Sequence, residues 1–476
     1  MAALVAAAAF LPTVLGHEGH HMDKIPEGMT VSPDPIDTIL WIHIFLQMLA
    51  FGVLFPLGMV LGIIKNRWHV PLQALSTAIA LVGFALGHLH GGRQFNPKNV
   101  HAMAATPLFL LLLGQVVLGI YLKLHLEHGV HARIRPPLRL AHSINGKAFP
   151  VYAWVQMVFG GITAMGFCQD DHLGQCLAHF IMGGAFIAYG VVLTILLLVG
   201  QAWLRRTGRS QEFFDSAVIA AWGCINTFTE HRWGTDWVKN DWQHTTMGII
   251  WWSAGLVGVW LSRDRDGNPK RNFVPGFVIL ITGWAMSAHP QDLMYSAMTH
   301  TMFGYTLMAA GLARIIEVAF VLRDKPCIDE SDETKTHSFQ YIPVYLLYAA
   351  GFLFMCATEE NMAFMDASSM DVVAYILVLF SLASLLFLFV MTLIHVYDRA
   401  QPRKVHGHPH NGVANSGRSR DALRDANEFE LEGLVSDDED EEAATRRKLL
   451  HREAMEDEEG SVSSPSTVGG NNERSV

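Results

Sequence analysis

Charged residues are scarce in this 476-residue chain, where Asp, Glu, Lys and Arg make up 16% of the total, against about 25% in an average soluble domain. Of the first 396 residues only 49, about 12%, are charged. So few charges exclude an ordinary water-soluble globule and a nucleic-acid binder of the basic-patch type. Five cysteines are too few for a disulfide scaffold. What the chain has in abundance is apolar residues, at 51%, and 24 histidines.

Long apolar runs predict an all-α integral membrane protein. A membrane-spanning helix needs about 20 apolar residues, and eleven windows qualify: 38–64, 70–89, 102–125, 143–167, 177–202, 213–230, 244–262, 273–289, 298–322, 340–358 and 371–397. Residues 1–16 are apolar but too few to span a bilayer, which is typical of a signal peptide cleaved before His17. We expect an extracytoplasmic lead over 17–37 and, because 398–476 are acidic and of low complexity, a disordered cytosolic tail there.

Basic residues in the loops predict the orientation of the chain. Lys and Arg follow the first, third, fifth, seventh and ninth windows, whereas the loops around Gln169, Gln291 and Glu359 contain neither. Because basic loops stay in the cytosol, the mature N-terminus is expected outside it and the C-terminus inside. The expected location is a membrane of the secretory pathway, namely the plasma membrane, the vacuole or another endomembrane.

Two cysteines flank one of the loops that lack basic residues. Cys168 and Cys176 are eight residues apart on the side expected to be oxidising. A local disulfide and a pair of free thiols both agree with this spacing.

One histidine stands near the start of each of the first four windows: His43, His69, His101 and His142. Consecutive spans run in opposite directions, so their starts lie on alternate sides of the membrane. His43 and His101 are therefore expected toward the outer face, and His69 and His142 toward the cytosol. Two imidazoles from facing helices suit the iron of a haem. Two separated pairs do not supply four ligands to one zinc ion. The alternative interpretation is that these histidines cap helix ends or meet lipid headgroups.

The residues around these histidines resemble the cytochrome b561 family. His43 precedes Pro56 by thirteen residues in WIHIFLQMLAFGVLFPLG, and the other three histidines are accompanied by Gln73 and Gly83, by Gln115, and by Gly146, Lys147, Gln156 and Gly160. The resemblance covers about 38–202, which it identifies as a four-helix haem-binding bundle. It implies two haem b groups, held by the pairs His43/His101 and His69/His142.

The resemblance also implies an activity. Members of that family commonly take electrons from cytosolic ascorbate and reduce ferric chelates or oxidised ascorbate outside, which makes the chain a transmembrane oxidoreductase of the ferric or monodehydroascorbate reductase type. Catalytic residues stay unknown. Basic residues on the cytosolic side could attract an anionic donor, although the positive-inside rule requires them anyway: Lys123, Arg133, Arg135, Arg139 and Lys147.

A second membrane domain of six helices is expected over 213–397, with its own histidines toward the outer face. These are His231, His244, His289 and His300, and Glu230, Glu359, Glu360 and His179 fall at similar depth. Imidazole and carboxylate ligands together suit zinc or iron, so the first four residues are candidate metal ligands. Histidine at helix ends is equally normal at a membrane interface.

Two wider resemblances concern this half and the whole chain. Segments beginning at Asn240 and His289 weakly resemble the eukaryotic transmembrane-protein-45 family. The haem-like half, this half and the acidic tail together resemble the fungal "yeast putative transmembrane protein" family, which names an architecture more than an activity. Arg314 and Glu317, three residues apart, are expected to form an ion pair on one helix.

The leading prediction is transmembrane electron transfer through two haem b groups, from a cytosolic ascorbate-like reductant to an extracytoplasmic or lumenal acceptor such as ferric iron. The rival prediction is a metal-binding membrane receptor, carrier or hydrolase that uses the outer-face histidines of the second half. The expected partners are the lipid bilayer, a small-molecule electron donor and acceptor, and a second copy of the chain in a homodimer. Nucleic acid is not an expected partner.

Overall fold

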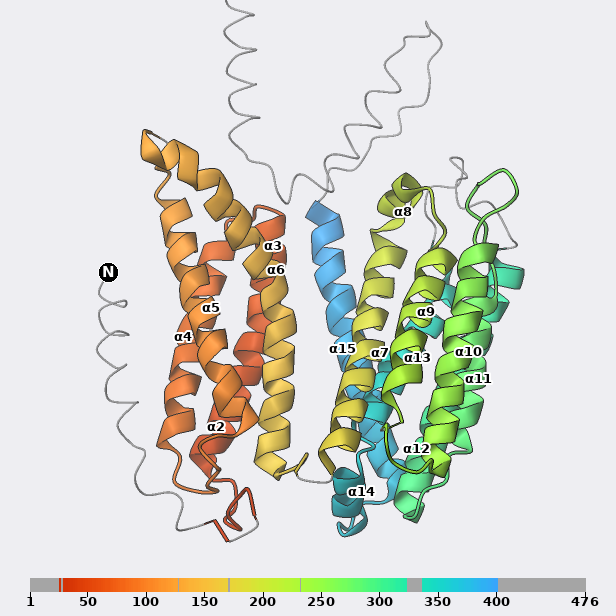
Figure 1. Cartoon of the computed structure of the whole chain (residues 1–476). Helices are drawn as coiled ribbons and strands as arrows, with labels where there is room; N and C mark the ends of the chain where they lie inside the picture. The colour runs from red at the N-terminus through yellow and green to blue at the C-terminus, as the bar shows by residue number, and fades with distance from the viewer. Residues whose placement is uncertain are drawn as a thin grey trace, which may run out of the picture. The chain divides into compact units, whose positions relative to one another are not determined.

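The computed structural model describes residues 25–26, 29–126, 128–169, 172–231, 233–322 and 336–400. Within these ranges the regular structure is helical, and the only strand-like pairing is two isolated β-bridges (Figure 1). Eight of the described helices are long and apolar enough to cross a membrane. The expected all-α membrane architecture is therefore confirmed at this level.

The first half of the described chain contains α2 (Thr38–Gln47), the π-helical segment η2 (Met48–Leu54), α3 (Phe55–Ile63), α4 (His69–Leu89), α5 (Val100–Lys123) and α6 (Val130–Met165). The first three elements form one continuous span. Asp37 begins this span, because its carboxylate accepts hydrogen bonds from the backbone N–H of Leu40 and of Gly91, each at 2.9 Å. These two bonds hold the pKa of Asp37 below its usual value. The charged cap therefore ties the start of the span to the loop after α4.

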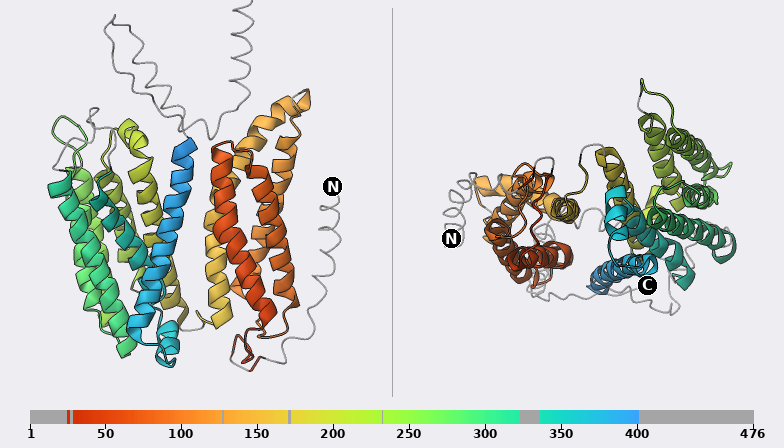
Figure 2. Two further views of the ribbon diagram at one scale, coloured as in Figure 1. Left: turned by 180° about the vertical axis from the view of Figure 1, so that it is seen from behind. Right: turned by 90° about the horizontal axis from the view of Figure 1, so that it is seen from below.

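The second half contains α7 (Leu173–Leu198), α8 (Gln201–Thr207), α9 (Gln211–Thr229), α10 (Lys239–Leu261), α11 (Val274–Ser287), α12 (Met294–Ile316), η4 (Glu317–Val321), η5 (Ser338–Gln340), α13 (Tyr341–Met355), α14 (Glu359–Asp366) and α15 (Val372–Ala400). The interior helix is α13, which packs against α7, α12 and α15 (Figure 2). Tyr348, Ala349 and Leu353 of this helix are fully buried. The core of the second half is therefore built around α13.

The expected count of eleven spans is only partly supported. Helices do occur at the windows 213–230, 244–262 and 273–289, where they are α9, α10 and α11. However, α11 is a shorter apolar helix, and α9 and α10 are not among the eight that qualify by length and composition. The expected signal peptide (1–16) and the expected tail beyond residue 400 lie outside the described residues. The span count and the orientation stay predictions.

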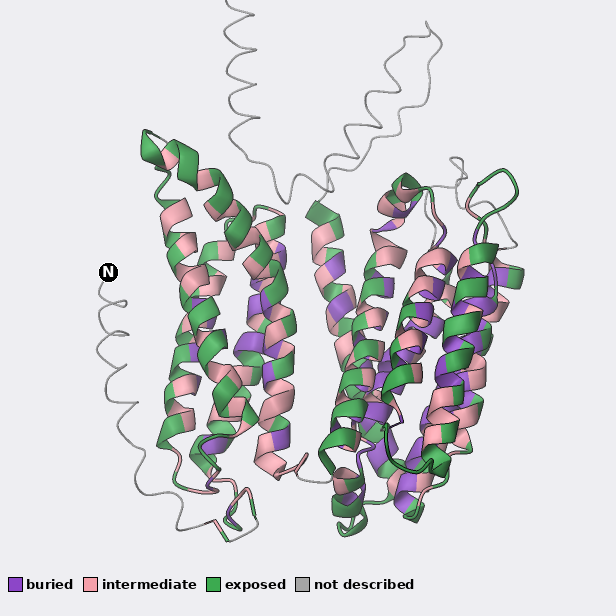
Figure 3. Cartoon of the chain, in the orientation of Figure 1, coloured by how far each residue is buried: buried purple, intermediate pink, exposed green. Residues whose placement is uncertain are grey.

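Side-chain burial differs sharply between the helices. In the described chain, 61% of the most apolar window of Ser338–Met355 is buried, against 11% for Val100–Lys123 and 17% for His69–Leu89 (Figure 3). By packing, Val117–Ile144 forms a compact unit of its own, and each unit is described by itself. Much of the surface of α4 and α5 therefore contacts no other part of the described chain.

Glycines let α11 and α12 approach closely. A Cβ on Gly304 of α12 would lie 2.5 Å from the carbonyl oxygen of Gly283 on α11 and 2.5 Å from the backbone nitrogen of Ser287. A Cβ on Gly283 would in turn meet the carbonyl oxygen of Gly304 at 2.5 Å. Small residues that let backbones touch are a common basis of helix association in membranes.

Substitution of Gly304 by leucine should therefore separate α11 from α12. We expect a destabilisation of roughly 1–3 kcal/mol or more, as is usual for overpacking a tight interface, seen as a lower melting temperature in detergent. The matched control is Tyr305→Leu on the same turn, because Tyr305 is 57% exposed. Equal melting temperatures for the two variants would contradict this packing.

The loop between α6 and α7 carries a disulfide. Cys168 and Cys176 are joined. This confirms the local disulfide, which the sequence left open beside a pair of free thiols. The backbone N–H of Cys168 also donates to Glu360 Oε2 at 2.6 Å. The loop is thereby attached to the start of α14.

Candidate functional site

The first two spans hold each other's histidines. His43 on α2 contacts α4, where its Nδ1 donates to the carbonyl oxygen of Gly83 at 2.7 Å. A Cβ on Gly87, one turn further along α4, would lie 2.6 Å from the same Nδ1. His69 on α4 makes the reciprocal contact, with Nδ1 2.7 Å from the carbonyl oxygen of Gly58. Gly62 is the glycine on which the His69 ring rests, with a Cβ there 2.8 Å from its Nδ1.

The third and fourth spans repeat this pattern. His101 on α5 has Nδ1 3.1 Å from the carbonyl oxygen of Gln156 on α6, and a Cβ on Gly160 would lie 3.2 Å from its Cε1. The side-chain amide of Gln156 lies 3.0 Å from the same Nδ1 and donates to the carbonyl oxygen of His101 at 2.9 Å. Within the separate unit Val117–Ile144, Cε1 of His142 lies 3.4 Å from the position of a Cβ on Gly119. Each of the four rings thus rests on a glycine.

The spacing along each helix explains how one span both supplies and receives a histidine. Gly87, Gly119 and Gly160 each follow the histidine of their own helix by 18 residues. Eighteen residues are five turns and a rise of about 27 Å, so the histidine and the glycine share one face at opposite ends of a span. The first span differs by one residue, since Gly62 follows His43 by 19. The π-helical segment Met48–Leu54 absorbs that extra residue.

The structure brings His43 and His101 together, as the sequence predicts for the first pair. Their ring centroids are 6.3 Å apart and the rings are nearly perpendicular, at 88°. Two imidazoles that bind one metal ion through bonds of about 2 Å have centroids roughly 6 Å apart. Both Nδ1 atoms contact carbonyl oxygens, which leaves each Nε2 to act as a ligand. This donor pair and its glycine supports fit a haem with two imidazole ligands.

For the second predicted pair, the structure describes each histidine by itself. His69 belongs to the larger compact unit and His142 to Val117–Ile144. Each has a glycine support of the same kind as His43 and His101. The pairing of His69 with His142 stays a prediction.

The candidate donor-binding cations are spread over α5 and α6. Lys123, Arg133 and Lys147 are exposed, whereas Arg135 and Arg139 are partly buried. Arg135 donates to the carbonyl oxygen of Leu122 at 3.3 Å. A donor site at these residues stays a prediction.

In the second half, a cavity of about 1100 Å³ gathers histidines from four segments. His244 on α10 lies 5.3 Å from His289 after α11, and His289 lies 6.3 Å from His300 on α12, all measured between ring centroids. His300 lies 5.8 Å from His179 on α7. Three of the four predicted metal ligands therefore line one cavity, together with His179, which the predicted ligand set left out.

His231 has different surroundings. Its Nδ1 lies 2.9 Å from Asp241 Oδ2, and its ring stacks on Trp237 with centroids 4.0 Å apart. Glu230 instead pairs with His244, with Oε2 3.2 Å from Nδ1. The structure therefore does not bring His231 into the row of rings formed by His179, His244, His289 and His300.

Another possible ligand cluster can be set aside. Within the described residues, the sulfurs of Cys168 and Cys176 and a carboxylate oxygen of Glu360 lie within 4.8 Å of one another. The two sulfurs are bonded to each other, so neither is a thiolate that could bind a metal ion.

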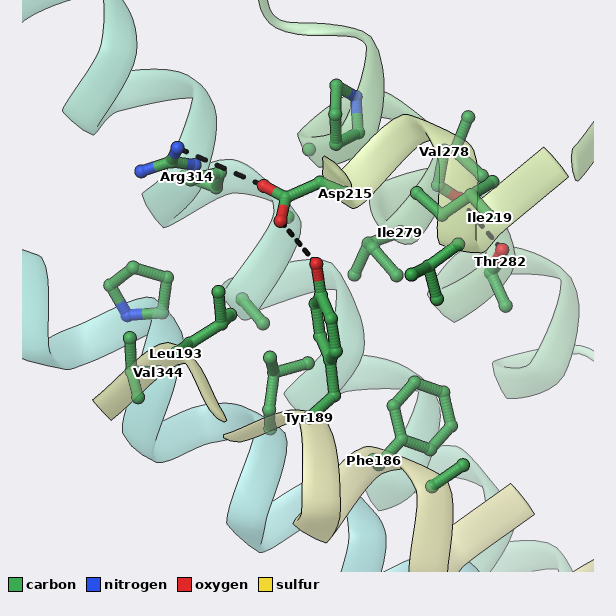
Figure 4. Close-up of a pocket in the computed structure, with 18 of the residues that line it drawn as sticks. Phe186, Tyr189, Leu193, Asp215, Ile219, Val278, Ile279, Thr282, Arg314 and Val344 are labelled. Carbon is green, nitrogen blue, oxygen red and sulfur yellow. Dashed lines mark hydrogen bonds and ion pairs between the residues drawn. The ribbon is translucent and has the colours of Figure 1, made fainter. Parts of the chain in front are cut away.

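A second cavity of about 370 Å³ shares Phe186, Trp222 and Trp251 with the histidine cavity and is mostly apolar. Its polar end holds Asp215, which accepts a hydrogen bond from the hydroxyl of Tyr189 and faces Arg314 (Figure 4). Nη1 of Arg314 lies 2.7 Å from Glu317 Oε1, which confirms the predicted ion pair.

These elements define a class: an all-helical membrane protein whose first spans carry an imidazole pair and whose second half encloses a histidine-lined cavity. The family model described as "Protein YTP1-like, C-terminal" matches residues 152–398, more than half of the chain, and a domain of unknown function, DUF2427, matches residues 23–125. The chain belongs to the YTP1-like family.

Among its relatives is Protein YTP1 of Saccharomyces cerevisiae, 43% identical over 264 residues, which cover 54% of this chain and 55% of that protein. The chain therefore matches about half the length of that relative. An uncharacterized membrane protein of Schizosaccharomyces pombe is 20% identical over 447 residues, with 68% of this chain and 87% of that protein covered. Another uncharacterized membrane protein, from Saccharomyces cerevisiae, is 24% identical over 264 residues, which cover 45% of this chain and 41% of that protein. No solved structure matches the chain.

The comparisons correct the family assignment made from the sequence. The stretch 38–202 is not assigned to the cytochrome b561 family: residues up to 125 match the DUF2427 description, residues from 152 match the YTP1-like description, and no cytochrome b561 family is found. The second half matches the YTP1-like description where the sequence resembled the transmembrane-protein-45 family. The sequence motifs that carried the resemblance are short, and histidine, glycine and glutamine at helical spacing do not by themselves define a family. What remains is the geometry of the residues themselves.

Proposed function

We propose that the chain is a transmembrane electron carrier whose first spans bind haem through paired histidines. The observation that carries the proposal is the His43–His101 pair, with ring centroids 6.3 Å apart and each Nδ1 within 3.1 Å of a carbonyl oxygen. A bound haem iron with two imidazole ligands would cycle between its ferric and ferrous states without an open position for substrate.

The protein residues have three tasks in this proposal. The carbonyl oxygens of Gly83 and Gln156 fix which nitrogen of each imidazole carries the proton, and so present Nε2 to the iron. Gly87 and Gly160 leave room for the rings against the neighbouring helices. Apolar residues between the two ends of the bundle, such as Phe51, Phe55 and Phe149, keep water out of it.

A second haem, with His69 as one ligand, is part of the proposal, and its pairing with His142 stays a prediction from the sequence. His69 begins α4 and rests on Gly58 and Gly62 of α3, whereas His43, near the start of α2, rests on Gly83 and Gly87 toward the end of α4. The two histidines therefore lie at opposite ends of the first two spans. Two centres at opposite ends of a span would let an electron from a cytosolic, ascorbate-like reductant reach an acceptor such as ferric iron on the other side.

Full-length protein purified in detergent should show a sharp reduced-minus-oxidised haem b spectrum. His101→Ala should lose about half of the haem, because one ligand of one pair is gone, and His88→Ala should lose none. His88 is the control, since it is exposed on α4 and its Nδ1 bonds to the Phe84 carbonyl oxygen of its own helix. A wild-type preparation that binds no haem when supplied with it would refute the proposal.

A further inference from the structure

Four imidazoles line the cavity of the second half in a continuous row. They come from α7, α10, the end of α11 and α12, and they are His179, His244, His289 and His300. Along the row, the ring centroids of His244 and His289 are 5.3 Å apart, those of His289 and His300 are 6.3 Å apart, and those of His300 and His179 are 5.8 Å apart. Residues up to 121 positions apart in the chain thus bring imidazole side chains to the same cavity.

Polar contacts of Nδ1 orient all four rings in the same sense. Nδ1 of His179 lies 2.9 Å from the carbonyl oxygen of Gln175, and Nδ1 of His300 lies 2.9 Å from that of Ser296. A carbonyl oxygen can only accept, so in both rings Nδ1 carries the proton and Nε2 carries the lone pair.

The other two rings contact side-chain oxygens. Nδ1 of His289 lies 2.9 Å from Gln243 Oε1, and the amide nitrogen of Gln243 is engaged with the carbonyl oxygen of Ala285 at 3.0 Å, which fixes the orientation of this side chain. Nδ1 of His244 lies 3.2 Å from Glu230 Oε2. Metal-binding histidines are held in this way, with one ring nitrogen donating to an oxygen and the other facing the metal.

Burial supplies a second, independent observation. His179 is 8% exposed and His300 is 4% exposed. Nε2 of His179 is buried and has no hydrogen-bond partner in the described part of the chain. A buried polar atom without a partner is costly, and a metal ion in the cavity would satisfy it.

We infer that these four histidines form a zinc site, with Glu230 and Gln243 orienting two of the ligands. Neutral imidazoles suit Zn²⁺, which takes four ligands in a tetrahedral arrangement at about 2 Å. In a tetrahedral site every pair of ring centroids lies roughly 5 Å apart, so zinc binding would draw neighbouring rings together by up to about 1 Å and would also bend the row until His244 and His179, at its two ends, approach each other. His231 does not take part, because Asp241 and Trp237 engage it.

The test is the zinc content of full-length protein in detergent, equilibrated with Zn²⁺ and then freed of unbound metal. Wild-type protein should keep about one zinc per chain and melt at a higher temperature than the zinc-free protein, because a ligand that binds only the folded state stabilises it. His300→Gln should lose at least nine-tenths of the zinc and the shift in melting temperature. His231→Gln should keep both.

Two further measurements make the outcome decisive. His244→Gln, at a partly exposed position, should also lose the zinc, and this variant replaces the buried His300 variant if that one does not fold. Haem content should be the same in all these variants, so failure of the zinc site is distinguished from failure of the proposed electron transfer. Less than a tenth of a zinc per wild-type chain, or equal zinc loss in His231→Gln and His244→Gln, would overturn the inference.

Discussion

Substitution of Gly160 by leucine should abolish the haem signal of the His43–His101 pair. A Cβ at position 160 would lie 3.2 Å from Cε1 of His101 and 3.3 Å from its Nδ1, so a four-carbon side chain has to displace the ring. A displaced ring cannot keep its contact with the carbonyl oxygen of Gln156, now at 3.1 Å. We expect loss of about half of the haem of wild-type protein, measured by absorbance per mole of folded chain.

The neighbouring residue provides the control. Gly161 is exposed, and a Cβ there would meet nothing within 4 Å. Gly161→Leu adds the same side chain to the same helix and should leave the haem content unchanged. Equal haem content in the two variants would show that the glycine does not support a ligand.

Arg314→Met should be the most destabilising single substitution in the buried ionic cluster. Nη2 of Arg314 lies 2.7 Å from Glu212 Oε1, and Nη1 lies 2.7 Å from Glu317 Oε1. Asp215 faces the same guanidinium at 4.0 Å. Both glutamates are almost fully buried, so the substitution leaves buried carboxylates short of a cation. Breaking such a pair from one side typically costs about 3–5 kcal/mol, which should appear as a large drop in melting temperature and yield.

Two companion variants separate charge from side-chain volume. Arg271 contacts only Glu212, at 3.4 Å, so Arg271→Met should cost clearly less. Combining Arg314→Met with Glu317→Gln removes one carboxylate and should restore part of the lost stability. If Arg314→Met melts like the wild type, or if the double variant is worse than the single one, the cluster does not stabilise the fold in this way.

The sequence predicts helices well where a long apolar composition alone is enough to identify a membrane-spanning helix. Long apolar windows correspond to helices at all eleven predicted places, because backbone groups in a membrane must be satisfied within the segment. Composition is less informative for α9, several of whose polar residues are buried inside the protein. Glu212 and Asp215 on α9 are such residues, and they lower the apparent apolarity of a helix whose charged side chains are buried.

For the sites, contacts between residues close together in the chain can be predicted from their spacing, whereas contacts between residues far apart in the chain cannot. The Arg314–Glu317 ion pair follows from three-residue spacing, whereas the partner Glu212 lies 102 residues away and could not be found that way. Likewise, His231 and His244 both end or begin helices at a similar predicted depth, yet only His244 turns toward His289. Depth along the membrane can be inferred from windows, but the direction of a side chain around its helix depends on which helices become neighbours. The 18-residue interval from histidine to glycine was visible in the sequence, although its meaning was not.

The π-helical segment Met48–Leu54 bears on how sequences of this kind should be aligned. Removing one residue from a regular helix rotates everything beyond it by about 100°, which would turn Gly58 and Gly62 away from His69. Here the wide turn already contains one surplus residue. A homologue with a one-residue gap between Met48 and Leu54 can close the turn into ordinary α-helix and then has the 18-residue interval of the other spans. A gap at this point is therefore a conservative change, whereas the same gap within α4 would shift the phase of the helix.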